Sequence, residues 1–229
     1  MTDLLSLPNE VLLLIAGHLA WQRDIHRLAQ TNSRLYNLLD RHLYRYNAER
    51  DHSSALLWGA ERGREATVRK ALSEGANVQA RSEGNRTPLS WAANNGHTEI
   101  VQLLLRSEGV NPDHPTYGGE TPLVLAAWNG HEEVVRLLLA TPGVDPNFQT
   151  ARGETPLSLA AYRGHTGIVK RLLDTGCVDP YAQNFRGETP LTLATGTGRH
   201  EVMKMLLNLQ SHGFSSKVSD PGRWKIVAC

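Results

Sequence analysis

The tripeptide Thr-Pro-Leu recurs in this chain at a constant interval, and this interval restricts the possible folds more than any other feature of the sequence. The copies begin at Thr87, Thr121, Thr155 and Thr189, so the differences 121−87, 155−121 and 189−155 are all 34. A Gly-His pair follows in three copies, at Gly96/His97, Gly130/His131 and Gly164/His165. A fixed period in this range is typical of a solenoid of stacked supersecondary units. Because one such unit cannot bury its own apolar face, its neighbours must supply the rest of the core.

The copy from Glu120 to Leu139 shows what each repeated residue does. Thr121 suits the N-cap of a helix, and Pro122 suits its first position because proline has no N–H to leave unpaired. Gly130 can end this helix in the left-handed conformation that glycine adopts freely. The apolar residues from Val134 onward recur at helical spacing and predict a second helix with a broad buried face. The sequence therefore predicts an all-α fold in which each repeat consists of two short helices and a turn.

This pattern resembles the ankyrin repeat, and one position departs from it. The residue after Thr-Pro-Leu is usually His in that family, where it braces neighbouring turns. Here the position holds Ser90, Val124, Ser158 and Thr192. The resemblance therefore implies somewhat looser stacking of the turns in this chain.

The repeats divide the chain into segments. Residues 48–86 are expected to form a linker helix and a degenerate first repeat, because Ala60 and Gly63 align with Ala93 and Gly96 at an offset of 33. Residues 87–209 hold four repeats of period 34, and the additional residue that lengthens the period should lie in the loop after each second helix. Residues 210–229 form an irregular tail that resembles the start of an incomplete repeat.

Residues 1–47 do not follow the repeat. Helical spacing of apolar residues predicts three short helices, a unit so small that a partner or the solenoid would have to stabilise it. Its Leu-Pro-x-Glu opening and later apolar positions resemble the F-box, whose helices dock on the Skp adaptor of a cullin–RING ubiquitin ligase. The resemblance assigns adaptor binding to Leu7, Pro8, Ile15, Leu19, Ile25, Leu28 and Leu35. In the alternative interpretation these helices only cap the solenoid, which needs an apolar face but not the Leu-Pro-x-Glu opening.

Charge and hydropathy exclude several classes of partner. The chain has 24 basic and 23 acidic residues, a net charge of +1, which gives no electrostatic case for nucleic acid or a membrane surface. The apolar run at residues 11–16 is far shorter than the roughly 20 residues that cross a bilayer. Asp3 and Glu10 precede it where a signal peptide carries Lys or Arg. We expect a cytoplasmic or nuclear protein that is monomeric outside its complexes.

The best titratable set is the three histidines of the Gly-His pairs, and their spacing argues against catalysis. Adjacent helices pack about 8–10 Å apart, whereas nitrogens that share a zinc ion each lie about 2 Å from it. Residues one repeat apart therefore cannot pool their side chains as ligands. We expect each histidine to bond to local backbone at a helix start. No nucleophile–base pair recurs either, so we expect no enzyme, no metal and no cofactor.

Residues that vary between repeats indicate where a partner binds. In the ankyrin family, partners contact the hairpin turns and the end of the first helix. The resemblance and the enrichment of Trp, Tyr and Arg in binding hot spots select Tyr117, Trp128, Asn129, Arg152, Tyr162, Arg163, Phe185 and Arg186 for substrate binding. Trp128 and Tyr162 should lie about 10 Å apart if adjacent helices pack normally. Alternatively, these two rings stack on each other to fill gaps between helices. Trp91 stands where other copies have Leu, which favours the core.

Together these features predict an adaptor without chemistry of its own. The N-terminal helices would dock on the Skp adaptor, and the repeats would select an unknown protein for ubiquitination. Two alternatives remain: a plain ankyrin scaffold whose N-terminal helices only cap the solenoid, and a regulatory subunit that inhibits an enzyme by covering its surface.

Overall fold

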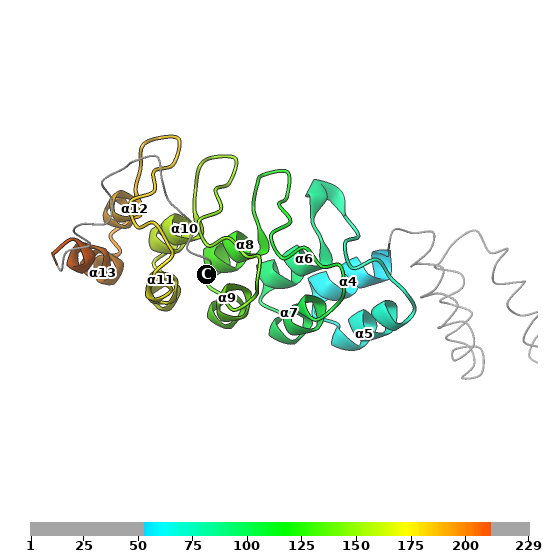
Figure 1. The fold of residues 1–229 in the computed structure, drawn as a ribbon. Helices are drawn as coiled ribbons and strands as arrows, with labels where there is room; N and C mark the ends of the chain where they lie inside the picture. Colours follow the sequence, from blue (N-terminus) through cyan, green and yellow to red (C-terminus); the bar gives the residue numbers. More distant parts are fainter. Residues whose placement is uncertain (1–52, 212–229) are drawn as a thin grey trace, which may run out of the picture.

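The computed structural model describes residues 53–211, which form a stack of five helix pairs (Figure 1). The pairs, which we number as repeats 1 to 5, are α4 (Ser54–Arg62) with α5 (Glu65–Ser73), α6 (Pro88–Asn95) with α7 (Thr98–Leu105), α8 (Pro122–Asn129) with α9 (Glu132–Leu139), α10 (Pro156–Arg163) with α11 (Thr166–Asp174), and α12 (Pro190–Gly196) with α13 (His200–Ser211). One 3-10 turn, η2 (Glu83–Asn85), precedes α6. Between residues 53 and 211 there is no strand, so the predicted all-α class is confirmed for this part. The three helices expected in residues 1–47 lie outside it.

The helices lie in two layers. The first helices of the repeats (α4, α6, α8, α10 and α12) form one layer, and each contacts the next. The second helices (α5, α7, α9, α11 and α13) form the other layer in the same way. Figure 1 shows long turns that lead into repeats 2 to 5 and project side by side from the layer of first helices. Residues one period apart therefore occupy equivalent places along one surface.

The first helices of repeats 2 to 4 begin and end as the sequence predicts. Thr121 Oγ1 accepts a hydrogen bond from the Val124 N–H, Pro122 is the first helical residue, and Gly130 ends the helix at φ 84°. Thr87, Thr155 and Thr189 cap their helices in the same way. At two of the positions where the ankyrin family usually has His, Ser158 and Thr192 complete a capping box by accepting a hydrogen bond from the backbone of the capping threonine. Ser158 and Thr192 therefore stabilise the N-terminus of the helix in which they lie.

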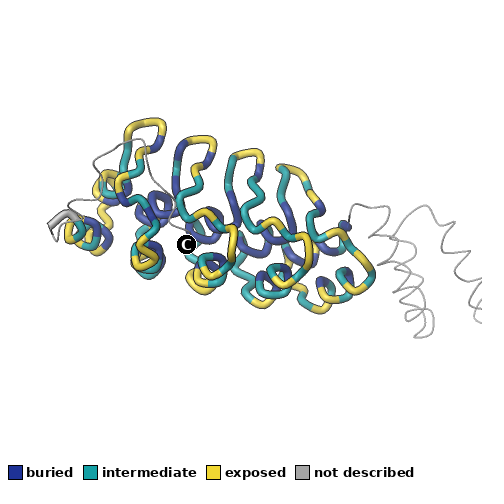
Figure 2. Tube along the Cα trace, in the orientation of Figure 1, coloured by how far each residue is buried: buried dark blue, intermediate teal, exposed yellow. Residues whose placement is uncertain are grey.

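A continuous apolar core runs between the layers. Each central repeat contributes an equivalent set, as Leu123, Ala126 and Ala127 of α8 and Val135 and Leu138 of α9 are all fully buried. The alanines let neighbouring first helices approach closely, because a methyl group occupies little space. Figure 2 shows buried residues along the helix interfaces and exposed residues at the ends of the projecting turns. The buried residues thus form the contacts between repeats, and the exposed ends of the turns remain accessible to other molecules.

The histidines of the Gly-His pairs join neighbouring repeats. The His131 side chain Nε2 lies 3.0 Å from the Asn94 carbonyl oxygen of the preceding repeat. Because a carbonyl oxygen can only accept, Nε2 carries the proton and donates it. The expected bond to local backbone is therefore wrong: each histidine is the N-cap residue of its own second helix but makes no side-chain capping bond there. The equivalent contacts are His97 with Glu61 O at 3.1 Å and His165 with Trp128 O at 3.1 Å.

The histidine ring of the next repeat packs against the glycine of each pair, where no side chain is present. A Cβ atom built on Gly96 would lie 2.5 Å from Nδ1 of His131, and one on Gly130 would lie 2.7 Å from Cε1 of His165. Glycine is thus needed twice, for its positive φ and for the absence of a side chain. We call this contact the Gly–His lock, formed by Gly63/His97, Gly96/His131 and Gly130/His165.

Repeat 5 replaces the histidine of the lock by arginine. Arg199 stands one period after His165, its Nε donates to the Tyr162 carbonyl oxygen at 3.2 Å, and its side chain lies against Gly164. The irregular sequence of repeat 5 therefore retains the lock. Neighbouring turns are also joined through backbone, by bonds from Tyr117 N to Gly84 O, Ala151 N to Gly118 O and Phe185 N to Arg152 O.

Two smaller predictions concern single positions. The additional residue that lengthens the period lies in the loop after the second helix, as expected, since α7 ends at Leu105 and residues 107–109 form a turn. Trp91 packs against the edge of the core and is not fully buried. Its indole Nε1 donates to Ser82 Oγ at 2.9 Å, and the Arg86 guanidinium lies 4.5 Å from the ring centre.

The Gly–His lock predicts different costs for two glycine substitutions with the same backbone conformation. Gly96 and Gly109 have φ angles of 74° and 75°, but a Cβ on Gly109 meets no atom within 4 Å. Gly109→Ala should lower the free energy of unfolding by about 1–2 kcal/mol through backbone strain. Gly96→Ala should cost roughly 1–3 kcal/mol more because the methyl group displaces the His131 ring. Urea titrations of both variants check this, and equal losses would contradict the lock.

Candidate protein-binding surface

Trp128, Tyr162 and Arg163 form a stacked group at the ends of α8 and α10, which we call the helix-end cluster. The rings of Trp128 and Tyr162 are stacked, with centroids 5.9 Å apart and planes inclined by 10°. The Arg163 guanidinium carbon lies 4.6 Å from the Trp128 ring centre. The predicted separation of about 10 Å, taken from ordinary helix packing, is therefore wrong, because the side chains lean together across the gap between helices. Trp128 is half-buried, and Tyr162 retains 40% exposure.

Asn129 lies next to this cluster, and its amide is already engaged. Its Nδ2 donates to the Asn94 side-chain oxygen at 3.1 Å and to the Leu125 carbonyl at 3.0 Å. Asn94 Nδ2 in turn lies 3.1 Å from Asn95 Oδ1, and Asn95 donates to the Glu61 carbonyl. This chain of amides crosses three repeats and holds the first helices in register.

The ends of the turns present the most exposed aromatic residues of the predicted set. Tyr117 is 82% exposed and Phe185 is 77% exposed, and Ala151 occupies the equivalent position between them. We call Tyr117, Ala151, Arg152, Phe185 and Arg186 the turn-tip row. The Phe185 ring rests on Gly153, where a Cβ atom would lie 2.8 Å from its Cδ1. One face of this ring is thus supported and the rest is open to a partner.

The turn-tip row also carries unpaired positive charge. Arg152 and Arg186 are exposed, and neither guanidinium forms an ion pair within residues 53–211. Arg199 is a further exposed cation on repeat 5 that the sequence analysis did not select. Its alignment with His165 at the period of the repeat is the signal that could have identified it.

A second row of polar contacts, the loop seam, joins the loops that follow α5, α7 and α9. It consists of Gln79, Asp113 and Asn147, which occupy equivalent positions of successive repeats. Gln79 Nε2 donates to the Gly109 carbonyl at 3.2 Å. Asn147 donates to the Cys177 carbonyl at 2.7 Å and accepts from the Asp179 N–H at 2.8 Å. Each side chain of the seam therefore reaches the backbone of the next repeat.

Asp113 is the ionisable member of the loop seam. Its Oδ2 accepts from the Asp145 N–H at 2.5 Å, but its Oδ1 is buried and has no hydrogen-bond partner among the described residues. Burial raises the pKa of Asp113 to about 6, the Asp145 backbone hydrogen bond opposes this, and the Asp145 charge adds to it. A carboxylate cannot donate to the Gly143 carbonyl, which is the equivalent of the acceptors used by Gln79 and Asn147.

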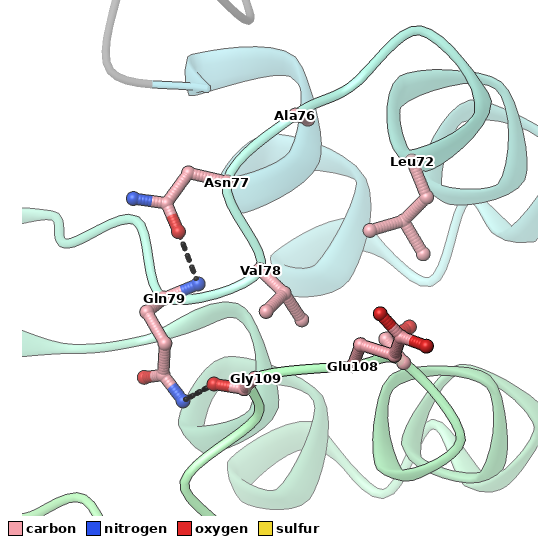
Figure 3. Close-up of a pocket in the computed structure, with 8 residues that line it drawn as sticks. Leu72, Ala76, Asn77, Val78, Gln79, Glu108 and Gly109 are labelled. Atoms are coloured by element: carbon pink, nitrogen blue, oxygen red, sulfur yellow. Dashed lines mark hydrogen bonds between the residues drawn. The ribbon is translucent and has the colours of Figure 1, made fainter.

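A shallow hollow lies between repeats 1 and 2, on the loops after α5 and α7 (Figure 3). It has a volume of about 420 Å³ and is lined by Leu72, Ala76, Asn77, Val78, Gln79, Ser107, Glu108 and Gly109. Figure 3 shows the Gln79 side chain at one edge of the hollow, hydrogen-bonded to Gly109. The hollow is thus part of the loop seam.

Between residues 53 and 211, no group of three or more His, Cys, Asp or Glu side chains is arranged to hold a metal ion. The same residues contain no helix with the length and apolarity to cross a membrane. The residues expected to bind the Skp adaptor all precede residue 53 and lie outside this part: Leu7, Pro8, Ile15, Leu19, Ile25, Leu28 and Leu35.

Stacked helix pairs with projecting turns define an α-solenoid repeat protein, and comparison with known families identifies which kind. The family model described as "Ankyrin repeats (3 copies)" matches residues 56–150 and 140–219. These matches cover well over half of the sequence, so the chain belongs to the ankyrin-repeat family. The model described as "F-box-like" matches residues 4–49. The sequence-based recognition of both elements is therefore confirmed.

Curated relatives match a short stretch of this chain. "Ankyrin repeat domain-containing protein 49" of Homo sapiens is 52% identical over 58 residues, which is 25% of this chain and 24% of that protein. The proteins of the same name from Bos taurus and Mus musculus are 48% identical over the same length and the same shares. This chain thus spans about a quarter of the length of the curated relatives it matches.

The stacking in the helix-end cluster predicts that Trp128 contributes to stability. Trp128→Ala removes the ring contact with Tyr162 and the cation–π contact with Arg163, and should lower the free energy of unfolding by roughly 1–3 kcal/mol. Tyr117→Ala is the matched control, because that exposed ring has no ring contact among the described residues, and it should change stability by less than about 0.5 kcal/mol. Thermal melts distinguish the two. A Trp128→Ala variant as stable as wild type would show that the ring is free for binding.

The loop seam predicts that Asp113→Asn stabilises the protein at neutral pH. Asparagine can accept from Asp145 N–H and donate to Gly143 O, a gain of about 0.5–1.5 kcal/mol for one hydrogen bond. In the wild type, the folded-state pKa of Asp113 is about 6, which is above the ordinary value of 3.8. The contribution of Asp113 to the free energy of unfolding is therefore fully present below about pH 4 and is lost as the pH rises through 6. The gain from Asp113→Asn should therefore increase with pH across this window.

The difference in the free energy of unfolding between wild type and Asp113→Asn separates the effect of Asp113 from that of the neighbouring His114. Burial and Arg81 lower the pKa of His114, which gives a pH dependence of opposite sign. This contribution is common to wild type and variant. Asn147→Asp is the reverse control and should lose stability at neutral pH. A stability difference for Asp113→Asn that does not depend on pH would contradict the assignment.

Proposed function

We propose that this chain is a substrate-recognition subunit of a cullin–RING ubiquitin ligase. The observation that carries the proposal is the order of its parts, an F-box-like segment at residues 4–49 followed directly by ankyrin repeats. An F-box contributes a contact with the Skp adaptor, and ankyrin repeats contribute a surface for a second protein. A chain with both can hold its partner beside the ligase in the cytoplasm or nucleus.

This role requires no reacting group in the chain itself. Binding a substrate and the ligase at once turns their encounter into an intramolecular event and raises the effective concentration of one near the other. A rigid connection favours this, because fewer conformations of the two sites are unproductive. The Gly–His lock and the amide chain through Asn129 supply that rigidity along the repeats.

The substrate would contact the turn-tip row and the exposed face of Tyr162. These residues include the exposed aromatic and arginine side chains that hot spots favour. Trp128, Asn129 and Arg163 also belong to this proposed site, but they are engaged with one another or with neighbouring helices and would mainly position the surface.

A plain ankyrin scaffold is the second candidate function. The observation that favours it is that the curated relatives, which match over 58 residues, are ankyrin-repeat-domain proteins by name. In that case the N-terminal helices would cap the solenoid, and no ligase would be recruited.

Substitution of the F-box-like opening distinguishes the two candidates. Leu7→Ala combined with Pro8→Ala should abolish binding of the Skp adaptor in calorimetry while the helical circular dichroism signal of the repeats is retained. Tyr117→Ala combined with Phe185→Ala is the matched control and should leave adaptor binding unchanged. A wild-type chain without adaptor affinity at concentrations of about tens of micromolar, weaker than specific interfaces usually need, would leave the scaffold as the function.

A further inference from the structure

Exposed arginines lie along the surface formed by the turns and the ends of the first helices. The turn that leads into repeat 2 carries exposed Glu83 between Arg81 and Arg86, and the equivalent turns of repeats 4 and 5 carry Arg152 and Arg186 at their tips. At the helix ends, repeat 2 has neutral Asn94 and Asn95. Repeats 4 and 5 have Arg163 and Arg199 at or near these ends. Arg152 and Arg186 are therefore exposed cations at neighbouring turn tips, although the whole chain carries a net charge of only +1.

The acidic residues of these turns form no ion pair with Arg152 or Arg186 within residues 53–211. The Glu120 carboxylate accepts from Thr116 Oγ1, and Glu154 from Thr150 Oγ1 at 3.4 Å. Glu188 accepts from Asn184 Nδ2 at 2.8 Å. These carboxylates are partly buried at the bases of the turns and satisfied there. Arg152 and Arg186 remain exposed at the tips, where a partner can approach them.

Two exposed aromatic side chains lie beside these arginines. Tyr117 and Phe185 are two repeats apart, with the small Ala151 between them. Two helix spacings correspond to roughly 16–20 Å, a length that an extended chain covers in about five or six residues. The support of Phe185 by Gly153 fixes one of these rings before binding, which reduces the entropy lost in a complex.

We infer that the turn-tip row binds an extended acidic segment of a partner protein, with two apolar residues five or six positions apart against Tyr117 and Phe185 and Asp or Glu side chains between them against Arg152 and Arg186. Carboxylates match guanidinium groups in charge and in bidentate geometry. This inference rests on the proposed function only in using the repeats as the binding face. It adds the chemical class of the segment and the residues that select it.

Selection from a random peptide library on the full chain tests the inference. Selected sequences should be rich in Asp and Glu and carry apolar residues at the stated spacing. Their affinity, measured by fluorescence polarisation, should fall about tenfold or more in the double variant Arg152→Glu and Arg186→Glu, because like charges then face each other. The control Arg106→Glu with Lys170→Glu changes the net charge equally at other exposed positions and should bind as wild type.

Several outcomes would overturn the inference. They are recovery of no peptide, recovery of peptides without acidic preference, equal weakening by both double variants, and tighter binding of a mixed-sequence single-stranded RNA than of the selected peptides. Each is separable from failure of the proposed function. A chain that selects acidic peptides but does not bind the Skp adaptor would retain this inference and lose the ligase role.

Discussion

The contact between neighbouring repeats is the constraint on which the rest of this structure depends, and the Gly–His lock is its clearest form. A histidine of one repeat donates to a carbonyl oxygen of the repeat before it, while its ring occupies the space that a glycine leaves free. A helix pair of this size cannot bury its own apolar face. Each lock fixes the position of one pair on the next, so the continuous core forms when the pairs stack.

This dependence decides which side chains are left for a partner. Residues at the ends of the first helices lie where repeats meet, and the structure uses them there: Trp128 stacks with Tyr162, and Asn129 bonds to Asn94. The turns extend beyond the helices and are joined to each other by backbone hydrogen bonds of Tyr117, Ala151 and Phe185, which do not depend on the side chains of these residues. Tyr117, Arg152 and Phe185 can therefore vary for recognition at little cost in stability.

In the loop seam, one of the contacts between neighbouring repeats is incomplete. Glutamine and asparagine donate across it at two levels, but Asp113 at the level between them has a buried oxygen without a partner among the described residues. Burial of a carboxylate without a compensating donor is costly, and the raised pKa of Asp113 expresses this cost. Because each repeat contacts only its neighbours, the effect is confined to one junction.

The sequence by itself determined the repeat, the boundaries of the first helices of repeats 2 to 4, and the family. Thr121, Pro122 and Gly130 act through local backbone chemistry, so their pattern could be interpreted without knowing the neighbours, and the Leu-Pro-x-Glu opening identified the F-box-like segment in the same way. The tertiary structure decided the partner of each side chain. In the folded chain the histidines bond to the preceding repeat and not to local backbone, and Trp128 stacks on Tyr162. Asp113 Oδ1 has no hydrogen-bond partner within residues 53–211. These outcomes depend on how side chains lean across the gap between helices of successive repeats, and spacing alone does not specify that direction.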